Sequence, residues 1–552
     1  MRRRKLLSVI LALSLCLTLP LGMAAAEEPA GTATEVKTSE ALTTALADSA
    51  VETVRLGTNI TITTDDSLTV SRTVTLDLNG CVLEKSGSGS VIKVESGGKL
   101  TLTDSNTGKQ THYFTKDSNG LWILTDTETE NFVTGGVITG GKGFLEGMNA
   151  CGGGVYVNKN GTFTMNGGNI AGCTAAPVEG RAYGGGVFVA EEGTFTMNGG
   201  SITGCTAVGN TLSFGGGIHN EGTTKLSGGA EIRDCHAKAG TGSHAYGGGV
   251  SDANGVFKIC DNVKITGCTA VGKESSTIKS DAMNIGYRGV ISGGTFDGSV
   301  ENKGTISGGT FNGAVSNNGS GKITKGTFNG AVTNTGSISA GTFNDAVTSW
   351  GTITGGTFNG GVTNEENGTI SGATVVAKVS TDTEFLAALA DENVTTIKLM
   401  KEITVEEGDA LTIERAVTLV DVSRTSLRLN LPLTIAKDGA LTLDGLEGFV
   451  NLYSRNGMVV NGSLTVGANC GVIFEGENAS LVVNAGGSVT TQPAGENTLC
   501  GALSLGQGVK LTVEGQLVNN GRLSVSDMAN LKKAAGIGGD LILYGMTIDE
   551  NY

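Results

Sequence analysis

The chain has 552 residues, 89 of them glycine and only 5 proline, and its formal net charge is −15. So little proline excludes a collagen or a proline-rich linker, and the acidic excess, with no basic patch, argues against nucleic-acid binding. Aromatic residues make up 5% and charged residues 16% of the chain, which favours a β-rich protein over a helical one.

The first 26 residues have the pattern of a secretory signal peptide. A basic start, MRRRK, precedes an apolar stretch at residues 6–23, and Ala24–Ala26 provides small residues for cleavage before Glu27. The alternative is an uncleaved membrane anchor, because the apolar stretch approaches the length of a membrane span. Pro20 and the three alanines favour cleavage. We therefore expect a secreted or cell-surface protein with no membrane span after cleavage.

Residues 36–103 are predicted to start a β-solenoid. SEALTTALADS has Leu42 and Leu46 four residues apart, as in a short amphipathic helix. Alternating runs follow: TVRL, NITIT, SLTV, TVTLDLNG, VIKV and KLTLTDS. A helix in this place can cap the open end of a solenoid and protect its first edge strand.

Residues 104–133 are predicted to form a β-hairpin inserted between coils, with Asn119-Gly120 at the turn. The hairpin brings Tyr113, Phe114 and Trp122 together in a chain that is poor in aromatic residues. Aromatic rings can stack on sugar faces, so these three residues are the candidate ligand-binding residues. The alternative is that the rings only pack the hairpin onto the flank of the coils.

Residues 134–275 repeat one unit four times. Glycine triplets open the units at 152, 184, 215 and 247, and therefore recur after 32, 31 and 32 residues. A second run such as GTFTMNGG and a third such as SITGCTA follow each triplet, so each unit has three short β runs. Self-similarity at a fixed period predicts a solenoid of stacked three-sided coils. The predicted inward ladders are Val155, Val187, Ile218 and Val250, and Ile170, Ile202, Ile232 and Ile265.

These units resemble those of right-handed parallel β-helix proteins of the pectin-lyase-like superfamily, in particular secreted bacterial surface proteins and adhesins. The polymorphic outer-membrane adhesins carry repeats of GGA followed by Ile, Leu or Val, and FxxN repeats. GGGV is similar to the first, and Phe163 to Asn166 and Phe195 to Asn198 match the second. The third unit departs from FxxN at both positions, and the fourth keeps only its phenylalanine. The resemblance covers residues 36–375, implies a right-handed parallel β-helix, and carries over no catalytic residue.

Residues 289–375 have a shorter period, because Phe296, Phe311, Phe328, Phe343 and Phe358 are 15, 17, 15 and 15 residues apart. This spacing predicts thin three-sided coils with one Ile, one Phe and one Val pointing inward in each. A polar ladder is expected at one corner, from Asn312, Asn329, Asn344 and Asn359. The chain has no GGxGxD nonapeptide, so no motif supports bound calcium, and we expect no cofactor.

Residues 376–552 are predicted to form a second β-helix domain. STDTEFLAALADENVTTIKLMKEITV parallels KTSEALTTALADSAVETVRLGTNITI in the order of helix and β runs. A second capping helix implies a second solenoid, which gives a signal peptide at 1–26, a first β-helix domain at 27–375 and a second at 376–552.

Four cysteines occupy the same slot of the long units and should stack in one column: Cys173, Cys205, Cys235 and Cys268. Their side chains point the same way, which strains a disulfide, and buried cysteine packs as a small apolar residue. An oxidising exterior favours disulfides instead. We favour the reduced ladder, and without a CxxC pair we expect no metal site.

Polysaccharide lyases and hydrolases with this fold need acidic and basic residues beside a groove. The candidates are Asp65, Asp66, Asp126, Glu128, Glu130, Arg233, Asp234 and His236. Each can equally be a solvated turn or coil edge, and no acidic ladder recurs from coil to coil.

The sequence therefore predicts an adhesin-like protein that binds glycans or cell-surface partners without catalysis. A β-helix polysaccharide lyase or glycoside hydrolase is the alternative, and a structural spacer of a surface layer is a second one. The oligomeric state is left open.

Overall fold

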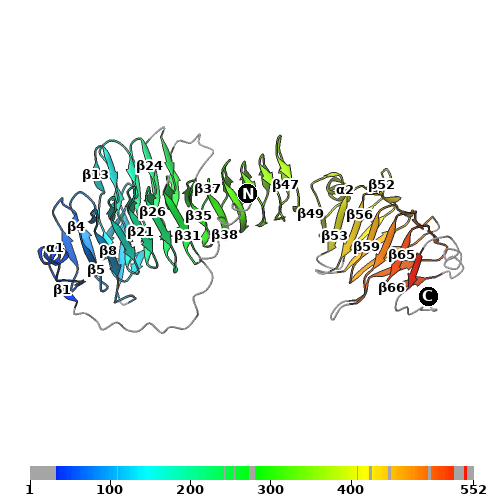
Figure 1. Cartoon of the computed structure of the whole chain (residues 1–552), viewed down its shortest axis with the longest axis horizontal. Coiled ribbons are helices and arrows are strands. Elements are labelled where there is room, and N and C mark those ends of the chain that lie inside the picture. The colour runs from blue at the N-terminus through cyan, green and yellow to red at the C-terminus, as the bar shows by residue number, and fades with distance from the viewer. Residues whose placement is uncertain are drawn as a thin grey trace, which may run out of the picture.

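The computed structural model describes residues 33–526 and 540–543, except 109, 241–242, 254, 261, 273–279, 407, 422–424, 446–448, 477 and 495–498. The predicted signal peptide lies outside these residues. The fold is the parallel β-helix that the sequence predicts: strands of successive coils pair in parallel, and the coils follow one another along the long axis of the molecule (Figure 1).

The first face of the solenoid is a 12-stranded parallel sheet. Successive side chains of a strand point to opposite faces, so the first and third residues of these three-residue strands point inward and the middle one outward. The inward first residue is apolar in every strand, whereas the third is Asn, Asp or Ser in seven of the twelve. The strands of this face are β4 (Leu68–Val70), β7 (Ile92–Val94), β15 (Val155–Val157), β20 (Val187–Val189), β25 (Ile218–Asn220), β30 (Val250–Asp252), β34 (Met283–Ile285), β37 (Val300–Asn302), β39 (Val315–Asn317), β41 (Val332–Asn334), β44 (Val347–Ser349) and β47 (Val362–Asn364).

The second and third faces belong to one 32-stranded sheet, because two seven-residue strands, β38 and β40, pair in both faces. The second face contains β1 (Thr34–Val36), β2 (Thr53–Leu56), β5 (Thr73–Asp77), β8 (Lys99–Thr103), β16 (Thr162–Met165), β21 (Thr194–Met197), β26 (Thr223–Leu226), β31 (Val256–Ile259), β35 (Val290–Ile291), β38 (Thr305–Phe311), β40 (Lys322–Phe328), β42 (Ser337–Ile338), β45 (Thr352–Ile353) and β48 (Thr369–Ile370). The third contains β3 (Ile60–Ile62), β6 (Val82–Lys85), β12 (Val137–Thr139), β17 (Asn169–Ala171), β22 (Ser201–Thr203), β27 (Glu231–Arg233), β32 (Lys264–Thr266), β36 (Thr295–Phe296), β43 (Thr342–Phe343), β46 (Thr357–Phe358) and β49 (Thr374–Val379), together with parts of β38 and β40.

The long coils carry more strands than the three that the sequence predicts. A corner at Gly172-Cys173, and at the equivalent Gly-Cys or Asp-Cys pair of the other units, splits the third predicted run in two. A further strand precedes each of the four glycine triplets. These additions form a four-stranded and a five-stranded sheet outside the three core faces. They are β18 (Thr174–Ala175), β23 (Thr206–Gly209), β28 (His236–Ala239) and β33 (Thr269–Val271), and β13 (Phe144–Glu146), β14 (Asn149–Cys151), β19 (Ala182–Tyr183), β24 (Leu212–Phe214) and β29 (His244–Tyr246).

The core is built from ladders of equivalent residues, as predicted. Val155 pairs with Val187 and the series continues through Ile218 and Val250, and the isoleucine ladder from Ile170 pairs in the same way. All of these side chains are fully buried. In the short coils the five phenylalanine rings stack with centroids 4.5–4.9 Å apart, which confirms the predicted phenylalanine column.

Two asparagine ladders brace the short coils. The predicted one is present at the exposed corner, where Asn329 Nδ2 donates to Asn312 Oδ1 at 2.8 Å and the pattern continues to Asn359. A second ladder, which the sequence analysis missed, is buried on the first face: Asn302 donates to Asn317, and Asn317 to Asn334, both at 2.7 Å. Each amide is satisfied only because the coils are in register.

The hydrogen-bond ladder of the third face continues into the second part of the chain through β49. Thr374 and Val375 pair with β46, and the residues from Val376 pair with β50, so the ladder of this face has no break at the predicted boundary near 375. The continuing strands are β50 (Thr396–Leu399), β53 (Ala416–Asp421), β56 (Ala440–Asp444), β59 (Ser463–Val466), β62 (Ser488–Thr491), β65 (Gln516–Asn519) and β67 (Asp540–Leu543). Two more sheets complete these coils: β51 (Ile403–Val405), β54 (Ser426–Leu429), β57 (Val450–Ser454), β60 (Cys470–Phe474), β63 (Ala502–Leu505) and β66 (Arg522–Val525), and β52 (Leu411–Ile413), β55 (Leu433–Ile435), β58 (Met458–Val460), β61 (Ser480–Val483) and β64 (Lys510–Val513).

Both predicted helices are present, as α1 (Ser39–Ala47) and α2 (Asp382–Ala390). The N-cap threonine side chain accepts a hydrogen bond from the helix backbone in both cases: Thr38 from the Ala41 amide and Thr381 from the Glu384 amide. An arginine from a later coil binds the C-terminal carbonyls: Arg72 those of Ala45 and Leu46, and Arg415 those of Ala388 and Asp391. Neither described helix is long and apolar enough to cross a membrane.

Candidate functional site

The predicted aromatic hairpin is a three-stranded antiparallel sheet, which we call the aromatic sheet. It consists of β9 (Thr111–Lys116), β10 (Trp122–Thr125) and β11 (Asn131–Thr134), with β9 in the middle. The turn between β9 and β10 contains the predicted Asn119-Gly120 and closes where Gly120 N donates to Asp117 O at 2.9 Å. Strand β11 was not predicted from the sequence, although NFVT has the composition of a strand.

The inner side of the aromatic sheet packs on the corners of the long coils. Phe114 is 0% and Trp122 3% exposed, and their rings lie 5.5 Å apart. They rest on Gly172 and Gly204, the glycines before the ladder cysteines, both at φ +60°. A Cβ at Gly204 would collide with the Trp122 indole. Glycine at this corner is therefore what lets the rings approach the coil backbone.

The outer side of the aromatic sheet carries different side chains. Because neighbouring residues of a strand point to opposite faces, Tyr113, Ile123 and Phe132 lie opposite the buried rings. Phe132 is 44% and Ile123 49% exposed, and the Tyr113 and Phe132 rings are 6.3 Å apart at 59°. Of the three predicted binding residues, Tyr113 is half-buried and the other two are buried. Tyr113 lies beside Phe132, which was not selected from the sequence.

Two cations tie the aromatic sheet to the coils. Arg233 Nη2 donates to the carbonyl of Phe132, and Lys238 Nζ donates to that of Asn119 at 2.9 Å. Arg233 also pairs with Asp234, 3.2 Å away. The candidate residues Arg233 and Asp234 therefore lie where the aromatic sheet meets the coils, and Arg233 has a positioning contact.

The other candidate near this corner is His236, whose Nδ1 lies 2.8 Å from Thr269 Oγ1. Burial, and then the charge of Lys238, lowers the pKa of this imidazole, so it stays neutral at pH 7. The three acidic candidates of the same region, Asp126, Glu128 and Glu130, are exposed in the connection between β10 and β11.

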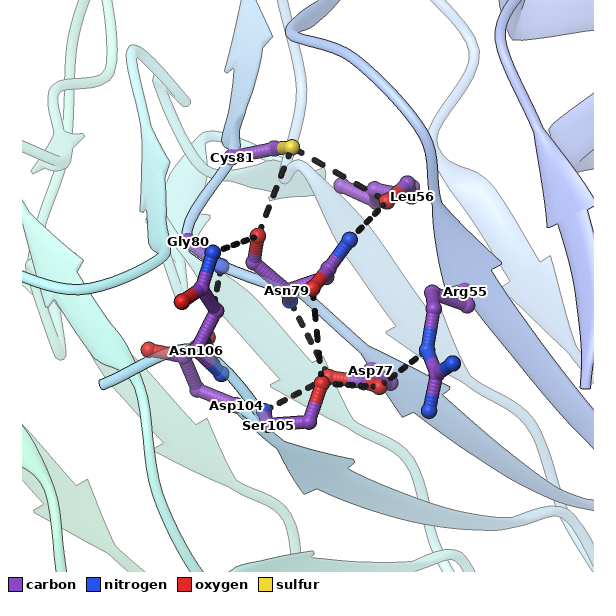
Figure 2. Close-up of polar contacts among 9 residues, drawn as sticks. All are labelled: Arg55, Leu56, Asp77, Asn79, Gly80, Cys81, Asp104, Ser105 and Asn106. Carbon is purple, nitrogen blue, oxygen red and sulfur yellow. Dashed lines mark hydrogen bonds and ion pairs between the residues drawn. The ribbon is translucent and has the colours of Figure 1, made fainter. Parts of the chain in front are cut away.

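A cluster of carboxylates lies at a corner of the first coils (Figure 2). Asp77 accepts hydrogen bonds from Arg55 Nε at 2.7 Å and from the Ser105 amide and hydroxyl at 2.8 and 2.7 Å. Burial opposes the ionisation of Asp77, but the bonds from Ser105, Arg55 and Asn79 together hold its pKa below the usual value. This carboxylate is thus kept charged and fully engaged.

Asp104 has the same role one coil further on. Its Oδ1 accepts from the Gly80 amide and its Oδ2 from the Gly136 amide, both at 2.7 Å. One carboxylate therefore joins the coil before it to the coil after it. Asp77 and Asp104 both accept hydrogen bonds from backbone amides, so their role is to stabilise the corner of the coils.

The candidates Asp65 and Asp66 lie at another corner of the first coils. Asp65 Oδ1 accepts from the Ser88 amide and hydroxyl at 2.9 and 2.7 Å, and the amide bond, followed by the hydroxyl bond, holds the Asp65 pKa below its usual value. Buried Lys85 donates to the carbonyls of Thr64 and Asp66, both at 2.8 Å. Burial lowers the pKa of this ammonium group.

The cysteine column runs beneath the aromatic sheet, inside the core. The four thiols are 0–5% exposed, and neighbouring thiols contact one another. Each Sγ also points to backbone carbonyls, as Cys205 does to Ile170 and Thr203 at 3.5 Å. The nine described cysteines are free, and burial raises the thiol pKa of Cys173 and Cys235.

A groove of about 770 Å³ runs along the short coils at the bend between the second and third faces. We call it the corner groove. It crosses five coils, from Lys264 on β32 to Thr342 on β43. Its floor is glycine because the coil backbones approach closely: a Cβ at Gly308 would collide with the carbonyl of Ser292.

Among the residues that the structure describes, no group of three or more His, Cys, Asp or Glu side chains is placed to hold a metal ion. The fold defines the protein as a parallel β-helix. A family model for a pectate lyase-like adhesive domain matches residues 376–484, which extend from β49 to β61. The match lies in the second part of the chain, whereas the repeats that resemble surface adhesins lie in the first. No curated protein and no solved structure matches the chain.

Proposed function

We propose that this chain is a secreted or cell-surface adhesin-like β-helix that binds glycans or cell-surface partners without catalysis. The observation that carries the proposal is the match of an adhesive-domain family to residues 376–484 of a parallel β-helix. A stack of coils is rigid, and contacts that are individually weak add along its length. Display of binding surfaces on such a stack is therefore the proposed mechanism.

We place one glycan-binding surface on the outer side of the aromatic sheet. Tyr113 and Phe132 offer apolar ring surface, which can cover the apolar face of a sugar while neighbouring hydroxyls bind its edge. Phe114 and Trp122 support this surface indirectly, because their packing on the coils holds the aromatic sheet in place. A surface held in its bound geometry loses little entropy on binding.

The hydrogen bonding of three carboxylates at the corners of the first coils supports a binding role over a catalytic one. Asp65, Asp77 and Asp104 each accept hydrogen bonds from backbone amides of other coils. A hydrolase instead needs two carboxyl groups that face a substrate across a set separation.

The test is a panel of neutral and acidic polysaccharides, incubated with residues 27–552 in the presence of calcium. Retention of the protein and shortening of the polymer are read from the same samples. We expect retention without shortening, and shortening of any glycan would overturn the non-catalytic proposal.

The aromatic surface is tested with Tyr113→Ala combined with Phe132→Ala. We expect the dissociation constant for a retained glycan to rise about tenfold, or about 1.4 kcal/mol. Tyr287→Ala is the matched control, because Tyr287 is an exposed ring (65%) elsewhere on the solenoid. An equal loss in both variants would refute the placement of the site.

A further inference from the structure

The charge of the corner groove differs from that of the rest of the chain. The chain as a whole has 53 acidic and 38 basic residues, yet the groove is lined by two lysines, Lys264 and Lys325, and by no carboxylate. Both lysines are exposed. Among the described residues, neither ammonium group has a hydrogen-bond or ion-pair partner. Glu231, in register with Lys264 on the preceding coil, lies outside the groove. Their ammonium groups are therefore available to a ligand.

The wall of the groove on the third face is a regular row of hydroxyl groups. Thr295 pairs with Thr310, Thr310 with Thr327, and Thr327 with Thr342. All four are half-buried and line the groove. Strand spacing places successive threonines about 4.8 Å apart along the solenoid axis. A linear ligand lying along this axis would thus meet an equivalent hydroxyl at every coil.

The lysines lie at separate points along this row. Lys264 pairs with Thr295 on the next coil, and Lys325 lies on β40, two residues before Thr327. Three coil steps separate the two strands, which corresponds to about 14 Å. Such a separation suits a polymer that carries negative charges at intervals better than a compact anion.

We propose that the corner groove binds a linear anionic glycan, with carboxylate or sulfate groups, that lies parallel to the solenoid axis. Lys264 and Lys325 bind the charged groups and the threonine row binds sugar hydroxyls. The acidic surface elsewhere repels the same polymer, so the groove is its favoured point of approach. The inference deepens the proposed function, on which it rests, by naming a ligand class and a second site distant in sequence from Tyr113.

The probes are heparin as the sulfated polymer, a linear polyuronate as the carboxylated one, and a neutral β-glucan of matched length. Each is titrated against immobilised residues 27–552 at low salt and again in 0.5 M NaCl. We expect one or both anionic polymers to bind at low salt and to weaken at high salt, because screening reduces contacts between exposed charges. Which polymer binds distinguishes sulfate from carboxylate recognition.

The residue test is Lys264→Gln combined with Lys325→Gln. Two exposed ion pairs at about 0.5 kcal/mol each predict a dissociation constant about fivefold higher. Lys322→Gln is the matched control, because Lys322 is an exposed lysine on the same strand as Lys325 but outside the groove. Its affinity should stay within twofold of the parent chain.

Three outcomes would overturn the inference: no binding of either anionic polymer, equal affinity for the neutral glucan, or wild-type affinity in the double lysine variant. The variant with Tyr113→Ala and Phe132→Ala separates this inference from the proposed aromatic surface. It should keep its affinity for the anionic polymer, and a loss there would assign that binding to the aromatic sheet instead.

Discussion

A buried aspartate in the first face makes a testable contribution to stability. Asp252 ends β30 and is 1% exposed. Its Oδ1 accepts from Asn220 Nδ2 at 2.7 Å and its Oδ2 from the Gly286 amide at 3.1 Å. These bonds stabilise the carboxylate, but burial is the larger effect and raises the Asp252 pKa to about 6.

The sign of the pH effect follows from this shift. An aspartate in the unfolded chain has a pKa of about 3.9, so between pH 4 and pH 6 the folded state holds the proton more tightly. The Asp252 contribution to the free energy of unfolding is therefore fully present below pH 4 and is lost as pH rises through 6. A shift of about two units corresponds to about 3 kcal/mol.

The perturbation is Asp252→Asn, which keeps the shape and removes the titration. At pH 4 we expect the variant to be about 1 kcal/mol less stable, because the Gly286 amide loses its acceptor. At pH 7.5 we expect it to be about 2 kcal/mol more stable, since it has no buried charge. The assay is denaturant unfolding from pH 4 to 8, followed by circular dichroism.

The informative quantity is the difference in free energy of unfolding between the parent chain and Asp252→Asn at each pH, because other carboxylates also titrate in this range. Hydrogen exchange of the amides in β25, β30 and β34 adds a local readout, which a solenoid requires because its coils need not unfold together. Asp345→Asn, at an exposed corner, is the matched control. A stability difference for Asp252→Asn that is independent of pH would refute the reasoning.

Three further substitutions test the packing. Phe328→Ala should destabilise the short coils by about 4 kcal/mol, because the ring is fully buried between two others, and amide exchange there should accelerate. Gly204→Ala should displace Trp122 and shift its fluorescence to longer wavelength, measured in a Trp350→Phe background. Arg415→Ala should cost about 2 kcal/mol, seen as faster amide exchange at the end of α2.

Each of these substitutions has its own control. Phe328→Leu keeps most of the buried volume and should cost clearly less than the alanine variant. Gly319→Ala adds a methyl group where no atom lies within 4 Å and should leave the fluorescence unchanged. For Arg415→Ala the internal control is α1, which Arg72 caps separately. If Arg415→Ala accelerated amide exchange equally at the ends of α1 and α2, the assigned role of Arg415 would be contradicted.

The sequence alone determined the ladders, because in a parallel solenoid the repeat period maps each residue onto its equivalent in the next coil. The spacing of Phe296, Phe311 and Phe328 therefore predicted a ring column that the structure contains. The exposed ladder from Asn312 followed from the same argument. Both capping helices were also predicted, since an amphipathic pattern is local and needs no knowledge of other coils.

Only the tertiary structure decided what covers the outward residues, because covering segments come from elsewhere in the chain. Phe114 and Trp122 pack on Gly172 and Gly204, and no periodicity links β9 and β10 to those corners. The corner groove likewise depends on the bends of five coils; its one visible signal was Lys325, which interrupts the small residues at that bend. Periodicity is a property of the repeat, whereas a surface depends on which segments meet.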